Sequence, residues 1–249
     1  MAAVAEADGA AALGAALAKL CTAAETDVSA SERLVGAGAG ETIFKVLGTA
    51  AGGEWPIAEQ CLQALANLTW GSVPTASMVL KRAPGVPQAV CRSLRAMADD
   101  QAQAAQDAAA VACVALYNLG WSSADNAAAV AAGGAVAALS AALAAYPGSR
   151  AVQREGVAAL AQLASVSREA VVAALTAAPH SASRDKALQA LTEGALVVAP
   201  AAQYGALGAG GSAKIYSSDR HVPEKDMTFA YDPPPQPMTY KRSCKGENG

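Results

Sequence analysis

One short phrase occurs twice in this chain and constrains its fold more than any other feature. Residues 64–72 read Ala-Leu-Ala-Asn-Leu-Thr-Trp-Gly-Ser, and residues 115–123 read Ala-Leu-Tyr-Asn-Leu-Gly-Trp-Ser-Ser. Leucines at equivalent places are separated by 48, 51 and 44 residues: Leu17, Leu65, Leu116 and Leu160. Internal periods of this size are typical of helical repeats, each of which buries its apolar faces by stacking on the next.

The composition indicates that the repeated unit is helical. Alanine supplies roughly a quarter of the 249 residues and aromatic residues only 4%, and alanine has the highest helix propensity of all residues. Runs of β-branched and aromatic residues with alternating polarity, which strands require, are missing. The sequence therefore predicts an all-α protein.

Apolar residues at helical spacing predict groups of two short helices and one long helix, separated by corners rich in glycine. After a first helix over 2–24 and a pair within 29–47, helices are expected over about 56–69, 76–82, 86–94, 102–119, 136–145 and 152–163, with a short helix capped by Asp125 and Asn126. A closing pair over 168–177 and 184–198 is shorter, as in a terminal capping unit.

The corners occupy the same place in successive units and read Ala-Gly-Ala-Gly-Glu-Thr-Ile (37–43), Ala-Pro-Gly-Val-Pro (83–87) and Ala-Gly-Gly-Ala-Val (132–136). With the long helix that ends in Ala-Leu-x-Asn-Leu, this pattern resembles the armadillo-repeat family, most closely over 126–163. The resemblance covers roughly residues 10–198, and the related HEAT repeats are an alternative for the outer units. It implies a right-handed α-solenoid of about four three-helix repeats.

In the armadillo family the long third helices line a concave groove, in which asparagines bind the backbone of an extended peptide. The resemblance therefore implies a groove that binds a partner through Asn67, Asn118, Gln162, Gln63, Trp70 and Trp121. Nuclear-import adaptors of the family have a tryptophan four residues before the asparagine, where this chain has Gln63 and Val114. As an alternative, the asparagines satisfy carbonyl groups of loops and the tryptophans fill gaps between units.

The sequence changes character at about Pro200, so we expect a helical repeat domain over 1–199, a Gly/Ala/Ser linker over 200–213 and an extended tail over 214–249. The tail collects large side chains and a run of prolines, a composition typical of a peptide that folds onto a partner. Its expected contacts are Tyr216, Phe229, Tyr231, Pro234 and Tyr240. The alternative is a disordered tail without a target.

Several functions lack support in the sequence. No catalytic site is predicted, because the only histidines, His180 and His221, have no nucleophile and acid arranged around them. We expect no cofactor, no metal and no small-molecule substrate. A formal charge of −3 without a basic block gives no support to nucleic acid as a partner. The acidic N-terminus, the lack of a long apolar run and the five scattered cysteines predict a protein of the cytoplasm that spans no membrane.

Together these features predict a non-enzymatic scaffold for protein–protein interaction, a structural subunit of a larger assembly. The alternative is an adaptor that binds short peptides reversibly in the groove. A small helical domain with a long tail of Tyr, Pro and Lys resembles accessory proteins of ciliary axonemes, and the alanine-rich composition resembles green-algal proteins. The resemblance implies a cytoskeletal or ciliary location.

Overall fold

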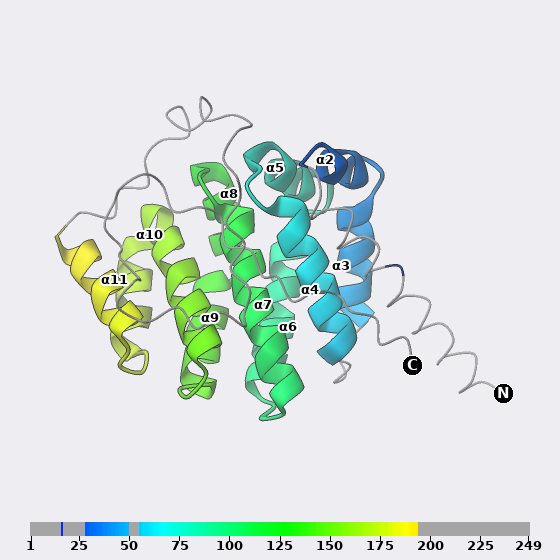
Figure 1. Ribbon diagram of the computed structural model, residues 1–249. Coiled ribbons are helices and arrows are strands. Elements are labelled where there is room, and N and C mark those ends of the chain that lie inside the picture. The colour runs from blue at the N-terminus through cyan, green and yellow to red at the C-terminus, as the bar shows by residue number, and fades with distance from the viewer. Residues whose placement is uncertain (1–15, 17–27, 50–54, 194–249) are drawn as a thin grey trace.

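The computed structural model describes residue 16 and residues 28–49 and 55–193, and within these ranges every regular element is an α-helix (Figure 1). The all-α prediction is confirmed for this part of the chain. The helices are α2 (Val28–Gly36), α3 (Ala39–Thr49), α4 (Trp55–Thr69), α5 (Val73–Arg82), α6 (Val86–Ala98), α7 (Gln103–Gly120), α8 (Ala124–Ala132), α9 (Ala135–Ala145), α10 (Arg150–Ala177) and α11 (Ala182–Thr192). The expected helix over 2–24, the linker and the tail lie outside the described residues.

The helices follow one another across the molecule in chain order, from α2 and α3 at one side to α11 at the other (Figure 1). The long helix α7 lies between two other long helices, because it packs against α4 on one side and against α10 on the other. Each group of two short helices and one long helix is called a triplet below. The shorter helices α6 and α9 are the middle helices of the triplets α5–α7 and α8–α10, and they also pack against each other. Helices at equivalent places in the sequence are therefore neighbours in space.

Serine side chains cap the first turns of four helices, α5, α8, α10 and α11. The Oγ of Ser72 accepts a hydrogen bond from the backbone N–H of Thr75 at 3.2 Å, so α5 begins at Val73, three residues before the expected start at 76. Ser123 caps α8 in the same way, by accepting from the N–H of Asn126. The prediction that Asp125 and Asn126 cap this helix was wrong, since both lie inside its first turn.

Helix α10 consists of two helical segments that meet at a kink between 163 and 168, where the sequence predicts a break. Only Ser167 departs from helical geometry there, with φ −147° and ψ 45°, and kinks the helix. The intervening residues include no glycine or proline, so the kink forms without either of the usual helix-breaking residues. Helix α11 ends at Thr192, and the remainder of the helix expected over 184–198 lies outside the described residues from 194 on.

Two of the glycine corners allow close contact with the preceding triplet. A Cβ atom on Gly133 would lie 2.6 Å from Cβ of Pro87 in α6, and a Cβ atom on Gly85 would lie 2.8 Å from the ring of Phe44 in α3. Both distances are shorter than any normal van der Waals contact. The corner at Gly133 thus needs glycine, because the backbone of α6 approaches it closely, whereas a side chain at position 85 would require the ring of Phe44 to move.

The core consists mainly of leucine and alanine side chains from all the triplets. Its largest fully buried residues include Leu62, Leu65, Leu116, Leu139 and Leu160. Three of the five cysteines, Cys61, Cys91 and Cys113, lie in the described part, where they are buried free thiols. Burial raises the pKa of the Cys61 thiol to about 12 and does the same for Cys91, so these thiols stay protonated at neutral pH.

By length and composition alone, α10 could cross a membrane, and so could the bent pair α8 and α9 if it formed a single span. In α10, 56% of the apolar window is buried inside the protein. The core helix of a water-soluble protein meets the same criterion, so this finding gives no location.

Candidate functional site

Two of the side-chain amides expected in the groove bind the backbone of the preceding long helix. The Nδ2 atom of Asn118 in α7 donates to the carbonyl oxygen of Ala66 in α4 at 2.9 Å. The Nε2 atom of Gln162 in α10 donates to the carbonyl oxygen of Gly120 in α7 at 2.8 Å. Both side chains are buried, and so is Asn67 at the equivalent place in α4. Asn118 and Gln162 thus connect neighbouring long helices. The alternative expected asparagines to bond to carbonyl groups of loops, whereas both acceptors here lie in helices.

Gln63 is also buried, four residues before Asn67 in α4. The residues at the same place in the other long helices are Val114 and Ala158, so no polar row continues across the helices there. Binding of a foreign peptide by these amides stays a prediction. The two bonds give Asn118 and Gln162 an internal role that does not depend on a partner.

The two tryptophans lie just beyond the ends of α4 and α7. The backbone N–H groups of Trp70 and Trp121 donate to the carbonyl oxygens of Asn67 and Asn118 at 3.3 and 3.4 Å. Both indoles are half-buried, and Trp121 packs against the core. The next residue in each turn has a left-handed backbone, with φ 65° at Gly71 and 51° at Ser122. The two turns therefore share one geometry.

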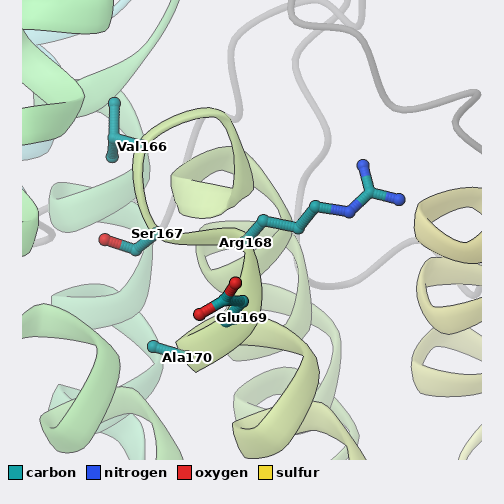
Figure 2. Close-up of a pocket in the computed structure, with 5 residues that line it drawn as sticks. All are labelled: Val166, Ser167, Arg168, Glu169 and Ala170. Carbon is teal, nitrogen blue, oxygen red and sulfur yellow. The ribbon is translucent and has the colours of Figure 1, made fainter.

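The third copy of this turn differs. Three residues after Gln162, where the first two copies have a tryptophan, this chain has Ser165. The next residue is Val166, at the position where the other two turns have a left-handed backbone. An open hollow of about 340 Å³ lies here, lined by residues 166–170 (Figure 2). The Arg168 side chain extends away from Ser167 (Figure 2) and donates to the carbonyl oxygen of Leu191 in α11.

A second line of bonds connects residues near the starts of the three long helices α4, α7 and α10. The Nε1 atom of Trp55 donates to Oδ2 of Asp100 at 2.6 Å, and the hydroxyl of Tyr146 donates to the carbonyl oxygens of Met97 and of Asp100, the latter at 2.7 Å. Bonds from the Ala102 N–H and from Trp55 lower the pKa of Asp100. Desolvation and the charge of Asp100 raise the pKa of Tyr146 to about 12. The sequence analysis missed these residues.

Two further pairs join the short helices: Ser77 donates to Oδ1 of Asn126 at 3.0 Å, and Arg82 donates to Oε1 of Glu41 at 2.8 Å. Each bond between triplets joins residues 41 to 52 positions apart in the sequence. This range overlaps the period of 44 to 51 residues between equivalent leucines. The polar contacts therefore repeat with the sequence.

Glu155 is a buried acid that the sequence analysis also missed. Its Oε1 atom accepts from Nε of Arg154 at 2.7 Å, whereas no hydrogen-bond partner for Oε2 is found among the described residues. Burial raises the pKa of this carboxyl, and the adjacent Arg154 offsets the effect only in part. A signal was available, because Glu155 is the single acid between residues 150 and 164 and lies two helical turns before Gln162.

The predicted tail contacts Tyr216, Phe229, Tyr231, Pro234 and Tyr240 all lie outside the described residues. Of the two histidines, His180 is described and exposed, and its Nδ1 atom contacts Arg184 at 2.9 Å. Within ranges 28–49 and 55–193, no group of three His, Cys, Asp or Glu side chains is placed to hold a metal ion.

The described part thus belongs to the class of all-α proteins and carries polar bonds between helices at a regular sequence interval. No family model matches the chain, and no curated protein matches it. The crystal structure of an engineered protein shares 19% sequence identity with it, covers 73% of this chain and 90% of its own, and has a TM-score of 0.39. A similarity this low carries no argument about fold or function.

Proposed function

We propose that the chain is a right-handed, armadillo-like α-solenoid of about four units that serves as a non-enzymatic scaffold in a larger protein assembly. The C-terminal tail and the solenoid surface hold it there. The bonds from Asn118 to Ala66 and from Gln162 to Gly120 carry this proposal. They favour a structural subunit over a reversible adaptor, because amides that bind the next helix are engaged before any peptide arrives.

The regular bonds between triplets give further support. Contacts at the loops, along the long helices and between the short helices all connect one triplet to the next, so bending the stack would break several bonds at once. A stiff spacer suits a subunit that holds other proteins at fixed positions. Placement in the cytoplasm, and in the axoneme in particular, stays an expectation from the sequence resemblance.

The durability of the complex in native extract tests the proposal. A structural subunit elutes from a size-exclusion column with a large assembly and stays with it after tenfold dilution, because its contacts exchange slowly. A reversible adaptor returns to the size of the free chain within minutes of dilution. That second outcome would favour the groove-binding alternative.

A further inference from the structure

The turn around Ser167 is more exposed than the two equivalent turns that follow Asn67 and Asn118. Eight residues after each amide, Thr75 and Asn126 are buried, whereas Ala170 is exposed. Val166 has 36% of its surface exposed and is the one large apolar residue in the described ranges with this much exposure. The hollow of Figure 2 lies at this turn and is lined by the charged Arg168 and Glu169 as well as by Val166, Ser167 and Ala170; the Arg168 side chain extends away from the other four.

The exposed turn at Ser167 also lacks the tryptophan that the two earlier copies have. In the first two copies a tryptophan stands three residues after the amide, at Trp70 and Trp121, and in the third copy Ser165 takes that place. A serine fills far less space than an indole, and an exposed valine beside an open hollow offers an apolar contact for a ring. The turn therefore fits an aromatic side chain supplied from elsewhere.

The described chain ends close to this turn. Arg168, which lines the hollow, donates to the carbonyl oxygen of Leu191, and the last described residue is Glu193. The first aromatic residue beyond is Tyr204, 11 positions after Glu193, and it is the single aromatic in the small-residue linker 200–213. Eleven residues reach at most about 36 Å when fully extended, which exceeds the ~10 Å diameter of a helix. So short a tether gives an effective concentration of about a millimolar.

We propose that Tyr204 places its ring in the hollow at the Ser167 turn, at the sequence place that Trp70 and Trp121 have in the earlier copies. The ring contacts Val166 and Ala170, and the phenol oxygen stays at the solvent edge. The linker then packs on the kink of α10, and the tail 214–249 starts from this face of the domain. This goes beyond the proposed function, since it specifies where the anchoring segment leaves the solenoid.

Hydrogen exchange of the full-length chain, followed by mass spectrometry, tests the proposal. The amides of residues 202–206 should exchange at least about tenfold more slowly than those of 209–213 in the same linker. The variant Tyr204→Phe should keep this protection, because the ring remains. Tyr204→Ser and Val166→Glu should each lose it, with the amides of α10 and α11 unchanged. Wild-type exchange at 202–206 as fast as at 209–213 would overturn the proposal.

A ring supplied from within α10 provides a second test that does not depend on disrupting the turn. In Ser165→Trp the new indole should occupy the hollow and release Tyr204, so protection of 202–206 falls while the melting temperature stays equal or rises. Retained protection in this variant would contradict the proposal. So would protection that increases with chain concentration, since the ring would then come from a second copy.

Discussion

The side-chain nitrogen of Asn118 lies 2.9 Å from the carbonyl oxygen of Ala66 and donates a hydrogen bond from α7 to α4 across 52 positions of sequence. Gln162 repeats the contact from α10 to α7. Residues that resemble peptide-binding residues of the armadillo family thus hold successive long helices together.

Asn118→Ala should therefore lower stability even without a partner. The carbonyl of Ala66 would lose a buried hydrogen bond, and we expect the free energy of unfolding to fall by about 1–3 kcal/mol. Chemical denaturation of the purified chain measures the change, with the exposed Gln88→Ala in α6 as control. If Asn118→Ala is as stable as the control, the hydrogen bond to Ala66 does not stabilise the fold, and Asn118 is better explained as a residue that faces a partner.

Gly133→Ala should destabilise the contact between triplets. Its new Cβ would lie 2.6 Å from Cβ of Pro87 and 3.2 Å from the backbone nitrogen of Gln88, and a backbone cannot move aside cheaply. We expect a loss of about 1–3 kcal/mol. Gly148→Ala is the matched control, since nothing lies within 4 Å of a Cβ there, and it should be neutral or stabilise by up to ~1 kcal/mol. Equal melting temperatures for the two variants would refute the close-approach explanation.

Tyr146→Phe should loosen the loops that precede α7 and α10. The variant keeps the ring but loses the hydroxyl that donates to the carbonyls of Met97 and Asp100. We expect a loss of about 1 kcal/mol in the free energy of unfolding, together with faster amide exchange in the loop at 99–102. Unchanged exchange there would show that the hydroxyl does not hold this loop.

The helices and their glycine corners could largely be predicted from the sequence, because apolar spacing and glycine are local signals. The start of α5 was expected at 76 with no capping residue assigned, and Asp125 and Asn126 were expected to cap α8, whereas Ser72 and Ser123 cap these two helices. The break within α10 was predicted at 163–168, and Ser167 leaves helical geometry there, but the sequence could not reveal that the two segments follow each other across a kink without an intervening loop.

The candidate site was predicted only in part. A repeated phrase identifies Asn67 and Asn118 as equivalent, yet it cannot reveal whether their amides face a peptide or the next helix. The contact between Trp55 and Asp100 was missed because the partners lie 45 residues apart and neither belongs to the repeated phrase. Glu155 was overlooked because a single acid beside an arginine resembles an exposed ion pair.

Glu155 should make stability depend on pH. Burial raises the pKa of this carboxyl in the folded protein above its ordinary value of 4.5. The folded state then holds the proton more tightly, so the stability from this group is complete below about pH 4.5 and is lost as the pH rises through the folded-state pKa. Glu155→Gln should remove this loss and be more stable than wild type at pH 7 by about 1–3 kcal/mol.

Denaturation curves at several pH values between 4 and 7 check this expectation. The exposed Glu169→Gln in the same helix is the matched control for loss of a carboxylate. Parallel pH profiles for wild type and Glu155→Gln would mean that Glu155 is ionised in the folded protein at no cost to stability.

Affinity capture from native extract with three baits tests the central claim most directly. The baits are the full chain, the chain ending at residue 199, and the full chain with Asn67→Ala and Asn118→Ala, used at a temperature where all three remain folded. An anchored scaffold predicts that the truncated bait loses the partners and the double variant retains them. Loss of the partners by the double variant alone would contradict the account and identify a groove-binding adaptor.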